Sequence, residues 1–394
     1  MNGERYAQIT GWGMAVPEKV LTNADLARVV DTSDEWILSR TGIRERHIVA
    51  SEKESTATLA LRTARAALLV ADVAPTQLDL VIVATATPEY AFPSTASLVQ
   101  DALGAANAGA FDLSAGCSGF IYALSLASNV IRGGGAEHVL VIGAETLSRI
   151  TDWTDRNTCV LFGDGAGAVV VSARPERCGV LASVLGSDGS GGDLLILPAG
   201  GSHAPASHET ISNGGHFVKM NGREVFRFAT TVIPKATEAV IQKAGWVLTD
   251  LALVIPHQAN NRIIESAARR LNLPLDRFFN NLDRYGNTSS ASIPIALCEA
   301  IAEGRVKAGD RLVLVGFGAG LTWAAAAVEW GVPVPVKPQP WPRRWLALLR
   351  FGLAAVRSLW LRGGRRVYNW LLGPVGKDDW RGKLRQWMGR WWKK

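Results

Sequence analysis

A cysteine between two glycines is the strongest candidate for chemistry in this sequence. Cys117 lies in Asp112-Leu-Ser-Ala-Gly-Cys-Ser-Gly-Phe120, where an apolar, strand-like stretch passes into a helix. A thiol at a helix N-terminus has its thiolate favoured by the helix dipole and by free backbone N–H groups. Cysteine is also among the most buried residue types, so the segment predicts either a nucleophile or a core residue.

Two further candidates stand where strands pass into helices. His257 lies in Val254-Ile-Pro-His-Gln-Ala-Asn260, at the end of an apolar run, and α/β folds place their sites at strand ends. Asn287 lies in Tyr285-Gly-Asn-Thr-Ser-Ser-Ala-Ser292, a polar turn before the next helix. Taken alone, His257 also fits a hydrogen-bonded core histidine, and Asn287 a turn or capping residue.

An internal repeat relates these three residues to one another. One shift of 173 residues places Cys117 over Ser290, beside Asn287, and places His257 over Ala84. The candidates therefore occupy equivalent strand–helix junctions of two halves and can converge between them. A nucleophilic thiol with two neutral hydrogen-bond donors suits thioester chemistry, because the thiolate accepts an acyl group while the donors stabilise an enolate oxyanion.

The elements around these residues predict an α/β fold with duplicated layers and two pseudo-symmetric halves, residues 1–173 and 174–330. The repeat aligns Thr76–Ile82 with Thr249–Ile255 and Val139–Gly143 with Leu312–Gly316. Buried strands are predicted at 78–85, 139–143, 167–172, 251–256, 312–316 and 323–329. Helices are predicted at 56–71, 119–133, 230–244 and 260–271.

The composition separates a globular body from a basic C-terminal arm. Residues 331–394 carry 15 Lys+Arg, 2 Asp+Glu and eight of the 14 Trp, whereas the first 330 residues carry 27 basic and 33 acidic side chains. Five prolines between Pro333 and Pro342 predict a stiff linker over 331–343. The segment 344–394 is then a Trp-rich amphipathic arm.

Several protein classes are excluded by the same composition. Four scattered cysteines with no CxxC argue against a disulfide scaffold or a thiolate zinc cluster. The first residues lack a basic stretch followed by an apolar run, and no stretch of 18 apolar residues occurs. We expect a cytoplasmic enzyme that needs no metal or cofactor.

With these motifs in view, the body (about residues 5–330) resembles β-ketoacyl-[acyl carrier protein] synthase III of the thiolase superfamily. Besides the Cys117, His257 and Asn287 motifs, the resemblance rests on five others. They are Asp34-Glu-Trp-Ile37, Arg40-Thr-Gly-Ile-Arg44, Phe92-Pro-Ser94, Leu161-Phe-Gly-Asp-Gly-Ala-Gly167 and Gly316-Phe-Gly318. The Gly-Asn-Thr-Ser turn selects the Cys-His-Asn class of that superfamily, and the resemblance implies a thiolase-like fold.

The resemblance implies a decarboxylating condensation that initiates fatty-acid or related biosynthesis. Cys117 takes an acyl group from acyl-CoA, malonyl-acyl carrier protein loses carbon dioxide, and His257 and Asn287 hold the enolate oxygen. Trp36, Arg40 and Arg156 fall where the family grips CoA. Phe317 fits the position beside the nucleophile, and Phe92 the loop that closes the partner's acyl pocket in family homodimers.

The carrier protein is acidic, so the resemblance also implies a basic docking face. The candidates are Arg227, Gln258, Asn260, Arg262, Arg269 and Arg270. Arg262 and Arg269 are seven residues apart on one predicted helix and share a face, which also fits a merely solvated surface. One departure is Phe317-Gly-Ala-Gly320, where the family commonly has Phe-Gly-Gly-Gly. The N–H of Ala319 completes an oxyanion hole only if the φ of Ala319 is negative.

Two alternative functions remain open at this stage. The acyl-Cys117 step fits an acyltransferase or a non-decarboxylative condensing enzyme of a specialised pathway. A catalytically idle thiolase-like scaffold attached to a membrane is the other, although a scaffold has no use for Cys117, His257 and Asn287 together. The sequence leaves the starter acyl chain, its CoA or carrier-protein donor and the pathway undetermined.

The arm has its own pattern, which the resemblance does not cover. Arg343, Arg350 and Arg357 recur every seven residues in an otherwise apolar stretch, and Trp380–Trp391 forms a second apolar stripe opposite basic residues. Two basic, Trp-bearing amphipathic segments favour peripheral binding to an anionic membrane at its inner, cytoplasmic face. Folding back onto the body, binding a partner protein and binding nucleic acid are the alternatives.

Overall fold

The first half of the body is built on a five-stranded mixed sheet. In the computed structural model, which describes residues 4–334 and 341–372, its strands are β1 (Tyr6–Ala15), β4 (Leu80–Ala84), β5 (Gly109–Leu113), β6 (His138–Thr146) and β7 (Asp164–Arg174). The order is β1-β7-β6-β4-β5, with β4 parallel to β5 and β6, and β7 antiparallel to β6 and β1. The continuous apolar runs of β4, β6 and β7 follow from burial of both sheet faces.

The second half repeats this arrangement with four strands. They are β8 (Gly179–Ser187), β11 (Leu251–Pro256), β12 (Arg311–Gly318) and β13 (Thr322–Glu329). The order is β11-β12-β13-β8, with β11 parallel to β12 and the other neighbours antiparallel. Strand for strand this matches β4-β6-β7-β1 in order and direction, so the predicted duplicated α/β fold is confirmed.

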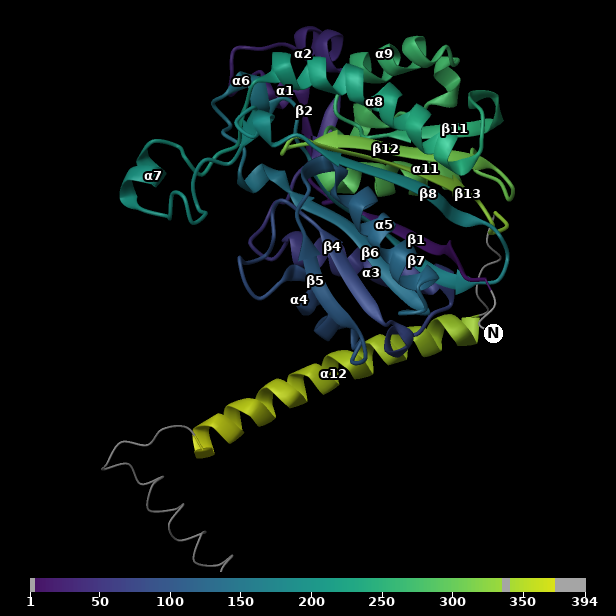
Figure 1. Cartoon of the computed structure of the whole chain (residues 1–394). Helices are drawn as coiled ribbons and strands as arrows, with labels where there is room; N and C mark the ends of the chain where they lie inside the picture. Colours follow the sequence, from purple (N-terminus) through teal and green to yellow (C-terminus); the bar gives the residue numbers. More distant parts are fainter. Residues whose placement is uncertain (1–3, 335–340, 373–394) are drawn as a thin grey trace, which may run out of the picture.

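Helices separate and cover the two sheets, giving five layers (Figure 1). The main helices are α3 (Thr56–Ala71), α4 (Thr95–Leu103), α5 (Gly119–Arg132), α8 (Gly222–Ala244), α9 (Asn261–Leu271) and α11 (Ser292–Ala302). Phe120 and Leu124 of α5 and Leu297 of α11 share one buried cluster with strands of both sheets. α3 and α4 pack on the outer face of the first sheet, and α8 and α9 on that of the second.

The predicted elements are present, and the sequence missed several others. α3 has the predicted bounds, whereas α8 begins eight residues before the predicted start, where Asn221 caps it by accepting from the N–H of Glu224. β1 escaped prediction since Gly11 and Gly13 interrupt its apolar pattern. The shorter elements are α1 (Asn23–Leu26), α2 (Asp34–Thr41), α6 (Arg156–Cys159), α7 (His208–Ser212), α10 (Leu282–Tyr285), β2 (Val20–Thr22), β3 (Glu45–His47), β9 (Leu195–Ile196) and β10 (Lys219–Met220).

The arm begins as one long helix, α12 (Trp341–Leu372), which starts within the segment predicted as linker. α12 runs along the end of the body formed by α3 and α4 (Figure 1). Its Phe351 is 5% exposed and joins the cluster formed by α3, α4 and the first sheet. The described part of the arm therefore packs on the body, which was one of the alternatives to membrane binding. The second predicted stripe, Trp380–Trp391, lies outside the described residues.

Candidate active site

Cys117 lies in a 3₁₀ turn, Gly116–Ser118, directly before the N-terminus of α5. Gly116 has a φ of +52°, and a Cβ there would lie 2.7 Å from the backbone N of Ala319, so the turn requires glycine. The thiol is 7% exposed and lies where the two halves meet. The turn therefore holds a nearly buried sulfur at the junction that the repeat predicted.

Burial controls the ionisation of this thiol. It raises the pKa of Cys117 to about 12, while a hydrogen bond with Ser289 lowers the pKa and the Glu145 carboxylate raises it further. The expectation that the helix N-terminus favours the thiolate is therefore wrong. Loss of water around the sulfur raises the pKa of Cys117 by more than the helix N-terminus lowers it, so Cys117 is a protonated thiol at rest.

His257 follows the last residue of β11 and is almost fully buried. Its backbone N–H donates to the carbonyl of Val315 at 2.8 Å, and its ring packs edge-on against Phe317 with centroids 5.2 Å apart. Its Nδ1 lies 2.6 Å from Ser292 Oγ. Burial lowers the pKa of His257 to about 3, so the imidazole is neutral near pH 7.

Asn287 is held by the first half of the chain. Its backbone N–H donates to the carbonyl of Leu161 at 2.8 Å, and its carbonyl accepts from the N–H of Gly163 at 3.0 Å. Its side-chain Oδ1 accepts from the N–H of Ser289 at 2.8 Å. This bond sets the rotation of the amide, so Nδ2 is the end that can donate to a substrate.

The end of β12 lies against Cys117 and His257, and Ser289 links Cys117 to Asn287. A Cβ on Gly318 would overlap the backbone of Cys117, so the strand passes directly beside the nucleophile. The preceding residue, Phe317, contacts His257. Ser289 completes the group because it hydrogen-bonds Cys117 and also donates its N–H to Asn287. The site is a small cluster around a thiol, an imidazole and an amide.

A buried carboxylate beneath this cluster was not predicted from the sequence. Glu145 Oε1 accepts from Ser289 Oγ at 3.0 Å and from Ser290 Oγ at 2.8 Å. Its Oε2 accepts from Thr87 Oγ1 at 2.7 Å, and burial raises the pKa of Glu145. Glu145 therefore fixes the turn that follows Asn287. The available signal was an acidic residue that closes the apolar run of β6.

The predicted acyl-pocket and oxyanion residues occupy different environments. Phe317 is 3% exposed, whereas Phe92 is 86% exposed on the loop before α4. Among the described non-glycine residues, positive φ is confined to Asp72, Asn272 and Ser289. The φ of Ala319 is therefore negative, as an oxyanion hole at its N–H requires. This N–H lies beside the turn of Cys117.

The predicted CoA residues form one cluster at the surface. The guanidinium of Arg40 lies 4.8 Å from the ring centroid of Trp36, and that of Arg156 lies 4.9 Å from it. Arg156 also donates to the carbonyl of Asp31 at 2.8 Å. Two cations beside one half-buried indole provide stacking and positive charge at one place, which suits a nucleotide with phosphates.

The four predicted docking arginines are exposed. Arg262 donates to the carbonyl of Ser39 at 2.8 Å, which links α9 to the end of α2 beside Arg40. Arg269 lies 4.0 Å from Glu265 on the same helix, and Arg270 follows it. On α8, Arg227 pairs with Glu224 at 3.1 Å. Such exposed pairs are weak, so these cations can exchange partners.

The two amides predicted for docking differ from the arginines. Gln258 is 1% exposed, and its Nε2 donates to the carbonyls of Pro256 and Phe279. Its prediction as a carrier-protein contact is therefore wrong, because its amide satisfies backbone groups inside the protein. Asn260 is partly exposed, and its Oδ1 caps α9 while its Nδ2 donates to the carbonyl of Arg40 at 3.0 Å.

Comparison with known proteins identifies the family of this chain. Residues 111–189 match the family "3-Oxoacyl-[acyl-carrier-protein (ACP)] synthase III", and residues 241–330 match its C-terminal part. The "Beta-ketoacyl-[acyl-carrier-protein] synthase III" of Symbiobacterium thermophilum is 57% identical over 83% of this chain and 99% of its own length. The chain belongs to the β-ketoacyl-ACP synthase III family.

Solved structures of β-ketoacyl-ACP synthases III superpose on the body. The Aquifex aeolicus enzyme has a TM-score of 0.76 at 48% identity, covering 82% of this chain and all of its own. The Thermus thermophilus enzyme has the same TM-score at 49% identity, covering 82% of this chain and 99% of its own. The family match ends at residue 330, so α12 lies beyond the part that this synthase shares with the family.

Proposed function

We propose that this β-ketoacyl-ACP synthase III condenses an acyl-CoA starter with malonyl-acyl carrier protein, releasing carbon dioxide, and so initiates fatty-acid biosynthesis. The proposal is carried by the grouping of Cys117 and His257 at the end of β12, with Asn287 linked to Cys117 through Ser289. The names of the high-identity relatives agree with it. The enzyme is an acyltransferase in which each of the three residues has a separate role.

In the loading step, Cys117 attacks the thioester carbonyl of acyl-CoA. The N–H groups of Cys117 and Ala319 are adjacent, so both can donate to the oxyanion of the tetrahedral intermediate. Collapse breaks the carbon–sulfur bond to CoA, and the proton of the Cys117 thiol ends on the CoA sulfur. Because burial keeps Cys117 protonated at rest, the thiol must ionise before the thiolate attacks.

In the condensation step, His257 and Asn287 act as neutral donors. If Ser292 donates to Nδ1 of His257, the ring hydrogen stands on Nε2 and can reach a substrate oxygen. Loss of carbon dioxide leaves the electron pair of the broken bond as an enolate, whose oxygen accepts from Nε2–H and from Asn287 Nδ2. The enolate carbon attacks the acyl-Cys117 carbonyl, and the expelled thiolate takes a proton from solvent.

Substrate delivery uses the surface between α2 and α9. Trp36, Arg40 and Arg156 are placed to stack an adenine and neutralise CoA phosphates. Arg262, Arg269 and Arg270 form the proposed docking face for the acidic carrier protein, with Arg227 on α8. Arg262 touches the end of α2, so both substrates enter from one side.

We propose that the working form is a cytoplasmic homodimer. β5 is an edge strand of the first sheet and carries a partly exposed Phe111. Phe92 and Tyr90 are exposed on the loop before α4. An open strand edge beside exposed aromatic residues favours pairing with a second copy. We further propose that the arm binds an anionic membrane surface.

Intact-protein mass spectrometry with a panel of acyl-CoAs tests the loading step. We expect a single acyl adduct on the wild type and none on Cys117→Ala, with the best-loaded chain identifying the starter. Malonyl-carrier protein is then added, and carbon dioxide release is measured. Adducts without carbon dioxide would instead favour an acyltransferase, and no adduct from any CoA or carrier-protein donor would favour an idle scaffold.

A further inference from the structure

One face of α12 packs against the body. Phe351 and Ser358 are 5% and 6% exposed, and the Arg65 guanidinium of α3 lies 5.6 Å from the Phe351 ring centroid. Ser358 Oγ donates to Asp101 of α4 at 2.6 Å, and Arg362 forms an ion pair with the same carboxylate. Phe351, Ser358 and Arg362 are seven and four residues apart, so they share one face of the helix, and that face is turned to the protein.

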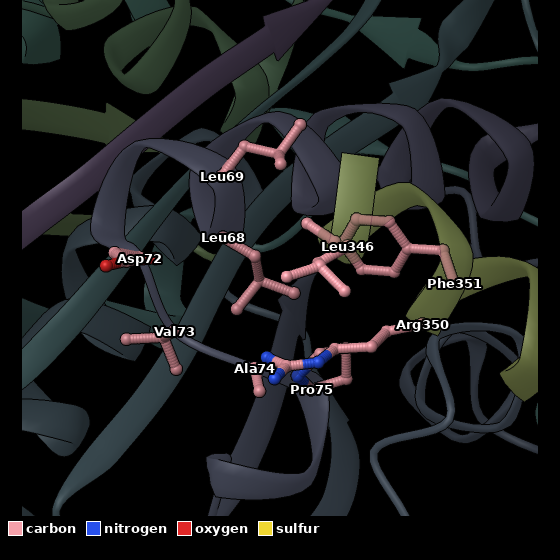
Figure 2. Close-up of a pocket in the computed structure, with 10 residues that line it drawn as sticks. Leu68, Leu69, Asp72, Val73, Ala74, Pro75, Leu346, Arg350 and Phe351 are labelled. Carbon is pink, nitrogen blue, oxygen red and sulfur yellow. The ribbon is translucent and has the colours of Figure 1, made fainter. Parts of the chain in front are cut away.

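α12 packs mainly against α4, and its first turns face α3 across a cleft. Figure 2 shows Leu346 and Phe351 of α12 opposite Leu68 of α3, with Arg350 reaching across Pro75. The cleft between the two helices has a volume of about 240 Å³. Further along, Ala354 lies directly against Gly104 at the end of α4. The rotation of α12 about its own axis is therefore set by packing.

The opposite face of α12 is apolar and exposed. At 100° per residue, Leu349, Leu353, Val356 and Trp360 lie about 140° to 200° from Phe351. Leu353 is 68% exposed, Val356 62% and Trp360 75%. We name these four residues the outer face. Apolar residues that protrude as a continuous stripe mark an interaction surface in a soluble body.

The charge around the outer face has one sign. α12 contains seven arginines and no acidic residue, and Arg350 and Arg357 are exposed between the body side and the outer face, about 100° and 120° from Phe351. A second α12 docked on this face would bring two arginine rows together, which disfavours self-association. Among the helices that the structure describes, none is long and apolar enough to cross a bilayer. A helix with an apolar side and arginine flanks suits the interface of an anionic bilayer.

We propose that α12 lies in the plane of an anionic membrane, with its outer face inserted among the lipids and its Phe351 side holding the enzyme. This defines which residues of the arm contact lipid, and it goes beyond the condensing activity without depending on it. α12 runs along one end of the body, whereas α2 and α9 lie at the opposite end (Figure 1). A bound enzyme therefore directs the Trp36 and Arg262 surface away from the membrane, toward soluble carrier protein.

Co-sedimentation of the full-length protein with vesicles tests the proposal. The vesicles contain phosphatidylcholine with 25% phosphatidylglycerol, or phosphatidylcholine alone. We expect binding to the anionic vesicles that weakens with added salt, and little binding to the neutral ones. Arg350→Gln with Arg357→Gln should weaken binding roughly 30-fold, since each arginine near the surface contributes about a factor of five.

The outer face is tested with a charge-matched pair of double variants. Leu353→Asp with Trp360→Asp should weaken binding by a factor of about 100 or more, because two carboxylates replace inserted apolar groups. Val247→Asp with Leu275→Asp is the control, because it adds the same charge at residues of the body that are 61% and 50% exposed. Acyl loading of Cys117 in solution checks that every variant is folded.

Three results would overturn the proposal. The first is no binding of the folded wild type to anionic vesicles, and the second is equal loss of binding in both aspartate pairs. The third is a fall in oligomer mass for Leu353→Asp with Trp360→Asp by light scattering, which would make a second copy the occupant. The orientation of the bound enzyme is tested separately. If the Trp36 and Arg262 surface faces away from the membrane, the loading rate of vesicle-bound enzyme should stay within about twofold of the rate in solution. Since loading is measured without vesicles as well, failure of binding and failure of the proposed function are distinguishable.

Discussion

The two turns related by the 173-residue repeat have the same backbone but different environments. Gly116–Ser118 precedes α5, and Ser289–Ala291 precedes α11 at equivalent positions. Gly116 has a φ of +52° and its equivalent Ser289 has a φ of +49°. Cys117 is 7% exposed, whereas its equivalent Ser290 is fully buried. One turn presents a reactive group to the junction, and the other is sealed inside the protein.

The residue that closes each central strand accounts for the difference. Glu145 of β6 and Gly318 of β12 are equivalent under the repeat. The side chain of Glu145 accepts the hydroxyl of Ser290, whereas Gly318 has no side chain and lets the end of β12 lie directly against the backbone of Cys117. Ser290 also donates to the carbonyl of Ala84, the residue equivalent to His257. We call each turn, with the residues around it, a half-site: the half-site of Gly116–Ser118 holds the proposed nucleophile, and that of Ser289–Ala291 supports it.

The largest difference in activity should appear when the central side chain of each turn, Cys117 or Ser290, is removed. Cys117→Ala should abolish the acyl-enzyme and lower condensation by at least about 10⁴-fold, because the covalent intermediate is lost. Ser290→Ala should leave loading within about tenfold, since Ser290 supports the turn without touching substrate. Intact mass and turnover measure both variants. Equal losses would contradict the division between a reactive half-site and a supporting one.

Asn287→Ala should separate the two chemical steps. We expect loading of Cys117 to remain, while decarboxylation of malonyl-carrier protein falls about 10²- to 10³-fold through loss of one oxyanion donor. Asn280→Ala, in the preceding loop, is the matched amide control and should retain near wild-type rates. Carbon dioxide release from pre-loaded enzyme is the measurement. A parallel loss of loading in Asn287→Ala would mean that the variant disrupts the turn itself.

Glu145→Gln should weaken the supporting half-site. It places an amide donor among hydroxyl and N–H donors, which should lower the free energy of unfolding by about 2–3 kcal/mol. Because burial raises the pKa of Glu145, its stabilising contribution is complete below the unfolded value of 4.5 and declines as pH rises through the folded pKa. The deficit of Glu145→Gln should therefore be larger at pH 5 than at pH 8 in denaturant titrations. A deficit that grows with pH would contradict this sign.

The smallest expected effect is the pH dependence of loading, which reports the ionisation of Cys117 and His257. With the Cys117 pKa raised to about 12, the thiolate fraction and the loading rate should rise about tenfold per pH unit between pH 6 and 8. With the His257 pKa lowered to about 3, its protonation should add no step near pH 6.5. Single-turnover loading across this range provides the test. A flat profile would show that the α5 N-terminus outweighs burial after all.

The sequence alone was sufficient for the repeat, the duplicated α/β fold and the choice of Cys117, His257 and Asn287 as candidates. Apolar periodicity is a local property, and the strand bounds it predicted agree with β4, β11, β12 and β13 within a few residues. Cys117, His257 and Asn287 were singled out because each places a reactive or polar group where a strand or turn passes into a helix. The repeat then placed those junctions opposite one another.

Only the tertiary structure decided how these groups are surrounded. The raised pKa of Cys117, the burial of Gln258 and the support from Glu145 depend on residues far apart in the chain. The arm illustrates the same limit, because its sequence pattern fitted a membrane helix and a docked helix alike. Contacts of Phe351 and Ser358 with the body decided which face of α12 is covered. Burial and desolvation are set by long-range packing, which a local pattern does not contain.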